Sequence, residues 1–314
     1  MQAAPVNVLH SITDLAELRG PMFLAIGVFD GVHLGHRAVL EHTLRAAASG
    51  EGTAVALTFD PHPATVLRPR QAPALLTSTR HKLRLIGLLG FQHALVVEFN
   101  ARFAATEPGD FVKELAGAAR PLRQICVGEG WAFGKGRAGN LDMLRSLADG
   151  LGFEVIGLPA VAVDGTAVSS TIIRAAVEAG DLLLAGRLLG REFSVLGTVI
   201  AGRKMGRTLG FPTANLRPES EQLPPNGVYA VRVAMNDTEV PGVANIGTRP
   251  TVTPDATERV LEVHLLDFTG DLYGTDLEVS FCQFLRAEKK FPDLEALRVQ
   301  IAADIGHARK ALAG

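Results

Sequence analysis

Cysteine is scarce in this sequence, and its scarcity excludes two classes of protein. Only Cys126 and Cys282 occur among 314 residues, and each lies inside an apolar run typical of a buried strand. Two isolated cysteines cannot build the disulfide framework of a small secreted domain, and no pair has the CxxC spacing of a structural zinc site. We therefore interpret both as reduced thiols of a cytosolic protein.

Long apolar runs and an excess of either charge are also missing. No stretch approaches the roughly 20 apolar residues of a membrane span, and the first residues, MQAAPVNVLHSITDL, lack the basic start and apolar centre of a signal peptide. The 31 Lys and Arg residues nearly balance the 33 Asp and Glu residues, so charge implies no nucleic-acid partner. We expect a cytoplasmic protein that binds neither membrane nor nucleic acid, and homo-oligomer formation stays open.

The first half of the chain alternates between strand and helix patterns. At 314 residues, the chain is long enough for two cores of roughly 100 to 200 residues each. Strand-like runs that are apolar on both faces occupy residues 22–29, 53–59, 93–99 and 124–128. Helical spacing of apolar residues falls between and after them, at residues 36–48, 79–89, 108–118 and 141–151. This order predicts an α/β domain with a parallel sheet, whose ligands gather at the carboxyl ends of the strands.

The pattern changes after a last helix near residues 180–190. Strand-like runs at residues 193–200, 227–234, 260–266 and 277–281 are separated by turns rich in Gly, Pro, Asn and Asp, without helices between them. Residues 292–312 then form one amphipathic helix with Leu294, Leu297, Ile301 and Ile305 along one stripe. We predict a mostly antiparallel sheet or barrel with a terminal helix, and place the boundary near Arg187, between domains 1–186 and 187–314.

The first candidate site is the segment GVFDGVHLGH at residues 27–36. His33 and His36 follow a strand and open a helix, where unpaired backbone N–H groups favour an anion. Gly31 and Gly35 leave room for close approach of the backbone, and the imidazoles can donate hydrogen bonds to a phosphoryl group. Zinc is the competing ligand, with Asp30 and His62 available to complete a metal site. A third alternative is that the two histidines merely cap a turn.

Two further segments extend this site. In TFDPHP, residues 58–63, two prolines are expected to stiffen the loop and to stop a helix from following. In VSSTIIR, residues 168–174, three hydroxyl residues stand where a helix should begin, and Arg174 lies one turn beyond Thr171. Hydroxyl groups with an arginine suit a triphosphate, although an ordinary helix cap and a solvated arginine would give the same pattern.

The second candidate site is GRKMGRTLGFPTAN at residues 202–215. Glycines and basic residues around a turn can hold phosphates, although a basic hairpin turn looks the same and the Walker A spacing is absent. Thr213 and Asn215 share one side of an extended stretch and offer oxygen ligands to a hard cation such as Mg²⁺. In RVLEVHL, Glu262 shares a face with His264, where a carboxylate can serve as a general base or can simply be a solvated surface charge.

In their order and spacing, GVFDGVHLGH, TFDPHP, VGEGWAFGKGRAG and SSTIIR resemble the adenylyltransferase half of the bacterial bifunctional riboflavin kinase/FMN adenylyltransferase family, also called FAD synthetase. The resemblance implies a Rossmann-like nucleotidyltransferase fold, with catalytic His33, His36 and Arg174 at the ATP phosphates. Asp60, Pro61 and His62 would belong to the flavin side. The implied ATP-binding set is Gly27, Phe29, Asp30, Gly35, Ser169, Ser170 and Thr171.

One position departs from this family's pattern. The family usually has an acidic or amide residue where Gly130 stands in EGWAFG, so a polar side chain expected near ATP and its magnesium is missing. In an extended segment, the neighbouring Glu129 would point to the opposite face and could not replace it. The departure puts the adenylylation activity in question.

GRTLGFPTANL, PNGVYAV, GVANIGTRPTV, LEVHLLDFTGDLYG and FLRAEKKF are similar to the riboflavin kinase domain of the same family, a six-stranded barrel with a C-terminal helix. The resemblance implies Thr213 and Asn215 as the magnesium site and Glu262 as the general base. Arg249 and Arg286 would lie on the flavin side, although a salt bridge of Arg286 with Glu288 or Asp293 would give the same sequence. The nucleotide would be covered by a loop that includes Gly202, Lys204, Gly206 and Arg207.

The combined resemblance implies a two-step enzyme. Riboflavin is phosphorylated to FMN and FMN is adenylylated to FAD, with Mg²⁺ as cofactor, ATP as co-substrate, and riboflavin, FMN and ATP as the small-molecule partners. Two alternatives stay open: a riboflavin kinase with a weakened or altered adenylyltransferase half, and a flavin-binding regulator without turnover.

Overall fold

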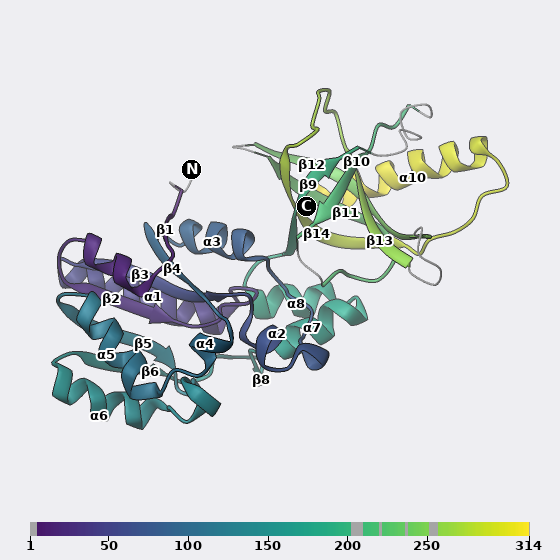
Figure 1. Ribbon diagram of the computed structural model, residues 1–314. Coiled ribbons are helices and arrows are strands. Elements are labelled where there is room, and N and C mark those ends of the chain that lie inside the picture. Colours follow the sequence, from purple (N-terminus) through teal and green to yellow (C-terminus); the bar gives the residue numbers. More distant parts are fainter. Residues whose placement is uncertain (1–4, 202–209, 220–221, 236–237, 251–256, 314) are drawn as a thin grey trace. The chain divides into compact units, whose positions relative to one another are not determined.

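The computed structural model describes residues 5–201, 210–219, 222–235, 238–250 and 257–313, with only the backbone at residues 249, 250, 257 and 258. The chain forms two compact units (Figure 1). The first consists of Met1–Pro73 and Thr79–Ser170, and the second of Ala74–Ser78 and Thr171–Gly314. These compact units do not locate the boundary between independently folding domains, so the boundary that the sequence predicts near Arg187 stays a prediction.

The first unit is built on a parallel sheet of six strands in the order β1-β4-β3-β2-β5-β6. The four predicted strands are present as β2 (Met22–Ile26), β3 (Thr53–Asp60), β4 (His93–Glu98) and β5 (Leu122–Gly128). The sequence did not predict the two edge strands, β1 (Asn7–Leu9) and β6 (Glu154–Leu158). A two-stranded hairpin is formed by β7 (Ala162–Val163) and β8 (Thr166–Ala167).

Helices cover both faces of this sheet. The predicted helices are α1 (Leu34–Ser49), α3 (Thr79–Leu88), α5 (Pro108–Ala118) and α6 (Leu141–Leu151). Leu24 and Ile26 of β2 point into one apolar cluster with residues of α5 and α6, whereas Ala25 points into another with residues of α1 and α3. Short helical segments complete the unit: η1 (Ile12–Glu17), α2 (Pro63–Leu67), η2 (Pro69–Gln71), α4 (Ala101–Ala104) and η3 (Lys135–Arg137). The α/β fold with a doubly covered parallel sheet is therefore confirmed.

The second unit contains a closed antiparallel barrel in the order β10-β13-β12-β11-β14-β9. Its strands are β9 (Phe193–Ile200), β10 (Ala214–Pro218), β11 (Gly227–Met235), β12 (Thr238–Pro250), β13 (Thr257–Leu265) and β14 (Asp276–Arg286). The helices α7 (Ser170–Ala179) and α8 (Leu182–Leu189) precede the barrel. The long helix α10 (Leu294–Leu312) packs on β11, β12 and β14. The predicted barrel with a terminal helix is confirmed.

Candidate active sites

The loop between β2 and α1 has an unusual backbone conformation. Phe29 and Val32 have φ of 51° and 41°, and Gly31 has φ of 83°. Non-glycine residues adopt such angles at a cost, and they persist where the surrounding structure enforces them, often at functional sites. At Gly27, a Cβ atom would lie 2.7 Å from Cε1 of Phe29, so a side chain there would displace the Phe29 ring. The glycine at residue 27 therefore serves the shape of the loop.

His33 and His36 form a stacked pair at the start of α1. Their ring centroids are 3.5 Å apart at an interplanar angle of 17°, and the rings of Phe29 and His36 make a T-shaped contact with their centroids 5.4 Å apart. Nδ1 of His33 accepts a hydrogen bond from the backbone N–H of His36 at 3.3 Å, so the proton of a neutral His33 ring is on Nε2. A Cβ at Gly35 would lie 3.2 Å from Cε1 of His33, which explains why glycine is suited to that position.

His36, the second histidine of this pair, has a perturbed pKa. Burial, then the nearby charges of His33 and Lys82, hold the pKa of His36 well below 6.5, so the ring is neutral at pH 7. Its Nδ1 atom is buried and has no hydrogen-bond partner within the described part of the chain. An orphaned buried nitrogen beside a helix N-terminus fits hydrogen bonding to a ligand better than it fits charge neutralisation of a phosphate.

The SST segment meets this loop. The Ser170 hydroxyl donates to the backbone oxygen of Asp30 at 2.9 Å, and the backbone oxygen of Val168 lies 4.0 Å from the position of a Cβ at Gly35. Ser169 directly precedes α7, as the sequence predicted for a helix start. The structure thus brings residues 168–170 to the His33 loop.

Thr171 and Arg174 belong to the second compact unit. There, the half-buried Arg174 donates from Nε to the backbone oxygen of Ala74 at 2.7 Å, so it is not a fully solvated surface charge. Its assignment to the ATP phosphates stays a prediction.

The TFDPHP segment differs from the expectation that its prolines stop a helix. Helix α2 begins at Pro63, because proline is tolerated in the first turn, where its missing N–H needs no partner. The Nδ1 atom of His62 caps this helix by accepting from the N–H of Ala64 at 3.0 Å. Asp60 and Pro61 are exposed at the end of β3.

Zinc receives no support from the ligand geometry. Over the residues that the structure describes, no three His, Cys, Asp or Glu side chains come together in a way that could hold a metal ion. Asp30, His33, His36 and His62 therefore do not form such a group.

An aromatic pocket lies in the first unit, near the carboxyl ends of β3 and β4. It has a volume of about 460 Å³. The sequence has 15 Phe, 2 Tyr and 1 Trp, and six of these rings line this one cavity. Trp131 and Phe133 are stacked with their centroids 4.4 Å apart. The lining rings are those of Phe59, Phe99, Phe103, Phe111, Trp131 and Phe133. Such a wall suits a flat, largely apolar ring system.

Gly130 lies at the rim of this pocket, in a turn. The N–H of Trp131 donates to the backbone oxygen of Gly128 at 2.9 Å, so the segment turns instead of being extended as predicted, and strand alternation does not direct Glu129 away from the side of Gly130. A Cβ atom at Gly130 would meet nothing within 4 Å. The space for the side chain that the sequence lacks is therefore open.

The barrel places Asn215, Glu262 and Asn245 in one row. Glu262 of β13 is directly opposite Asn215 of β10 on one side and Asn245 of β12 on the other. Directly opposed residues share a face of the sheet, and the neighbouring residues Ala214, Val263 and Ala244 are buried on the other face. The sequence predicted Asn215 and Glu262 but missed Asn245.

Two cavities adjoin this row, and Thr213 lines both of them. The larger, of about 560 Å³, includes Asn215 and runs along residues 268–273. The smaller, of about 310 Å³, contains Glu262, His264 and Asn245 and is closed by Leu297, Ile301 and Ile305 of α10. The predicted stripe of α10 therefore faces the cavity at these three positions, whereas Leu294 is 61% exposed.

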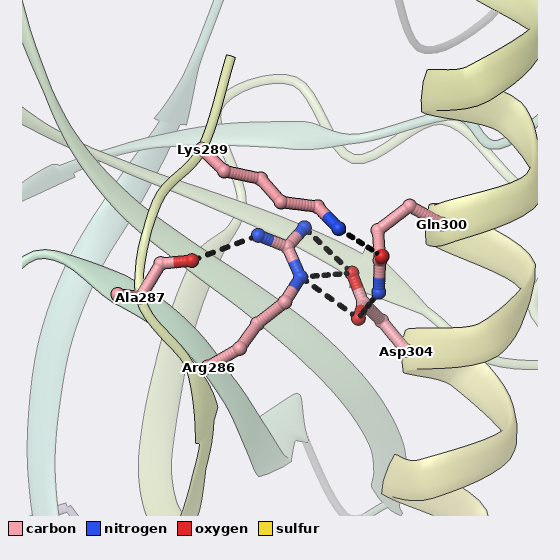
Figure 2. A network of polar contacts seen from close by, with 5 residues as sticks. All are labelled: Arg286, Ala287, Lys289, Gln300 and Asp304. Carbon is pink, nitrogen blue, oxygen red and sulfur yellow. Dashed lines mark hydrogen bonds and ion pairs between the residues drawn. The ribbon is translucent and has the colours of Figure 1, made fainter. Parts of the chain in front are cut away.

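Arg286 is paired with Asp304 of α10 rather than with Glu288 or Asp293 (Figure 2). Its Nε and Nη2 donate to the two carboxylate oxygens at 2.8–3.0 Å, and its Nη1 donates to the backbone oxygen of Ala287. Gln300 donates to Asp304, and Lys289 donates to Gln300. The Asp304 side chain is only 4% exposed, so this network joins the end of β14 to α10 at the wall of the smaller cavity.

Several predicted residues of the barrel are not described. Gly202, Lys204, Gly206 and Arg207 lie outside the described residues. For Arg249, only the backbone is described, in β12 opposite Glu258.

A parallel sheet with stacked histidines at a helix N-terminus, together with a barrel that carries a carboxylate between two amide side chains, defines a two-part nucleotide-dependent transferase. The family models agree. The model described as FAD synthetase matches residues 16–172, and the model described as riboflavin kinase matches residues 189–312.

Curated relatives match over nearly the full length. The bifunctional riboflavin kinase/FMN adenylyltransferase of Escherichia coli (strain K12) is 39% identical over 288 residues, which cover 91% of each chain. The protein of the same name from Pseudomonas fluorescens is 41% identical over 304 residues, covering 97% of this chain and 96% of the relative. The chain belongs to the bifunctional riboflavin kinase/FMN adenylyltransferase family.

A solved structure, described as a macrolide-efflux protein from Streptococcus pneumoniae, is also similar. The TM-score is 0.82 and the sequence identity is 28%. The match covers 98% of this chain and 99% of the other chain. Among the described residues, no helix has both the length and the apolar character needed to cross a membrane.

Proposed function

We propose that this chain phosphorylates riboflavin to FMN at the barrel and adenylylates FMN to FAD at the parallel sheet, using ATP in both steps. The observation that carries this proposal is the pair of unlike sites: an aromatic pocket near a stacked histidine pair in the first unit, and a carboxylate flanked by Asn215 and Asn245 in the second.

In the kinase step, Glu262 takes the proton of the ribityl hydroxyl, and that oxygen attacks the γ-phosphoryl group of ATP, whose bond to the bridging oxygen breaks as ADP leaves. Thr213 and Asn215 offer a hydroxyl and an amide oxygen, which are ligands suited to Mg²⁺, next to Glu262. Bound Mg²⁺ would offset the charge of the phosphate oxygens. The apolar cavity wall from α10 suits the flavin ring, which places its hydroxyl tail toward Glu262.

In the adenylylation step, the FMN phosphate is itself the nucleophile and attacks the α-phosphoryl group of ATP, so no general base is needed. The N-terminus of α1, Nε2–H of His33 and the neutral His36 donate hydrogen bonds to the phosphates and to the leaving pyrophosphate. The aromatic pocket receives the isoalloxazine ring. The placement of Arg174 at the pyrophosphate, and of Asp60, Pro61 and His62 on the flavin side, rests on the resemblance alone.

Product analysis tests the whole proposal. The purified chain is incubated with Mg-ATP and either riboflavin or FMN, and the flavins are separated by chromatography. We expect FMN and FAD from riboflavin, and FAD from FMN. FMN without FAD would favour a riboflavin kinase with a weakened or altered adenylyltransferase half, for which Gly130 is the reason. Bound flavin without either product would favour the regulator.

A further inference from the structure

Lys82 is a buried cation in the first unit that the reaction described above does not use. It lies on α3 and is 4% exposed. Its Nζ donates to the Thr58 hydroxyl at 3.1 Å, and that hydroxyl donates to the backbone oxygen of Val28 at 2.9 Å. The chain of contacts runs from α3, through the end of β3, to the start of the loop that carries His33. An ammonium group is seldom buried without a specific purpose, because removing it from water is costly.

The charges around Lys82 belong to this same loop region. Asp30, which is 2% exposed, and Asp60 act electrostatically on Lys82, and Lys82 in turn acts on His36. Negative charge on Asp30, in the loop that precedes α1, and on Asp60, at the end of β3, would repel a triphosphate, and a neutral His36 cannot offset it. Lys82 supplies positive charge at the place where this repulsion arises.

We propose that Lys82 is a positioning residue for adenylyl transfer, whose buried ammonium, held by Thr58, offsets Asp30 and Asp60 so that the β2–α1 loop accepts the triphosphate of ATP. This inference rests on the proposed function of the sheet. Lys82 itself is expected to touch no phosphate; it acts through the two carboxylates and through the loop backbone that Thr58 holds.

The protonation of Lys82 provides a readout that a merely structural role would not change. Burial lowers its pKa to about 8, while Asp30 and then Asp60 act to raise it, so the group is charged at pH 7. The groups that face it are Asp30 from the loop after β2, Asp60 from the end of β3, and His36 from α1. Above about pH 8, the ammonium loses its proton, and kcat/KM for ATP in FAD formation should fall.

The experiment measures FAD formation from FMN and Mg-ATP by the full chain. For Lys82→Met, we expect KM for ATP to rise by about tenfold or more, with riboflavin phosphorylation unchanged. Lys82→Arg should restore most of the affinity and remove the fall above pH 8. Thr58→Val should raise KM for ATP by a smaller factor, and Thr58→Ser, which keeps the hydroxyl, should not.

Matched controls separate charge and packing effects. Lys113→Met removes an exposed lysine of α5, and Thr43→Val removes another buried hydroxyl, which donates to Val39 within α1 at 3.0 Å; both should keep KM for ATP. If the wild-type chain forms no FAD, the proposed function fails. If it forms FAD and Lys82→Met keeps wild-type KM and pH profile, the inference on Lys82 fails. Should Lys82→Met not fold, wild-type behaviour of Thr58→Val together with an unchanged pH profile in Lys82→Arg would overturn it.

Discussion

Glu262 lies directly opposite Asn215 in the barrel, on adjacent antiparallel strands. This pairing places the carboxylate next to an amide that can bind Mg²⁺, on the face of the sheet away from the barrel interior. The proposed base and the proposed Mg²⁺ ligand are thereby held at a separation fixed by the strand ladder, which is more rigid than a loop would be.

Replacing Glu262 should lower the rate of riboflavin phosphorylation and leave the rate of FAD formation unchanged. Glu262→Gln keeps the shape of the side chain but cannot accept the proton of the attacking hydroxyl, so kcat for riboflavin phosphorylation should fall by about 10² to 10⁴. FAD formation from FMN should keep its rate. The exposed Glu239→Gln on β12 is the matched control. A kinase rate within twofold of wild type would rule out Glu262 as the base.

The Arg286–Asp304 pair should contribute strongly to stability because it is mostly buried, with side chains 21% and 4% exposed. Arg286→Met leaves the Asp304 carboxylate buried without its cation, and we expect a loss of about 3–5 kcal/mol in the free energy of unfolding. Arg298→Met, which breaks an exposed pair with Glu295 on the same helix, should cost less than about 1 kcal/mol. Urea unfolding of the full chain measures both.

The double variant Arg286→Met with Asp304→Leu distinguishes structure from flavin contact. Removing both charges should restore much of the stability, because no unpaired charge remains. If Arg286→Met raises KM for riboflavin and the double variant returns it to the wild-type value, Arg286 acts by holding α10 on the barrel. A KM that stays raised in the stable double variant would support the predicted direct role of Arg286 on the flavin side.

Restoring a polar side chain at Gly130 should increase FAD formation. The position has open space for a Cβ atom, so Gly130→Asn should fold normally and should raise kcat/KM for adenylylation several-fold if the missing side chain limits that step. Gly150→Asn adds the same side chain at an exposed position of α6 that is also open, and should change nothing. An unchanged rate in Gly130→Asn would show that this departure from the family pattern is harmless.

The architecture was predictable where burial produces a simple pattern. The central strands β2 to β5 lie between two helical layers and read as apolar runs, whereas β1 has only three residues and β6 is partly exposed along its length. Strand β12 was missed because Pro241, Gly242 and Gly247 interrupt it. Periodicity reports which faces are buried, and it gives no strong signal for short, edge or interrupted strands.

The candidate sites were predictable only in part. Motif spacing placed His33 and His36 at a helix start, but no composition rule anticipates the left-handed backbone of Phe29 and Val32 or the stacking of the two imidazole rings. Nothing in the sequence marks Lys82 as buried, because a lysine on an amphipathic helix ordinarily faces solvent. Asn245 was missed for a related reason: its position opposite Glu262 follows from strand register, which one sequence does not provide.

The neutral state of His36, with its Nδ1 atom buried, predicts how stability should depend on pH. Its pKa is well below 6.5 in the folded protein, whereas in the unfolded chain it is about 6.5. As the pH falls below about 6.5, the unfolded state takes up a proton that the folded state does not, so the folded state loses stability. The contribution of His36 is therefore complete above that pH and is lost progressively toward the lowered pKa.

His36→Asn should reduce this acid sensitivity. Thermal unfolding of the full chain between about pH 7 and pH 5 should show a smaller decrease in midpoint for the variant than for wild type, because one proton-binding difference between the two states has been removed. His10→Asn, at an exposed histidine, should follow the wild-type curve. Under the proposed function, His36 donates a hydrogen bond to the phosphates of bound ATP. Saturating Mg-ATP should therefore raise the unfolding midpoint of the wild type more than that of His36→Asn. Parallel pH curves for wild type and His36→Asn would mean that His36 is already protonated or exposed in the folded state.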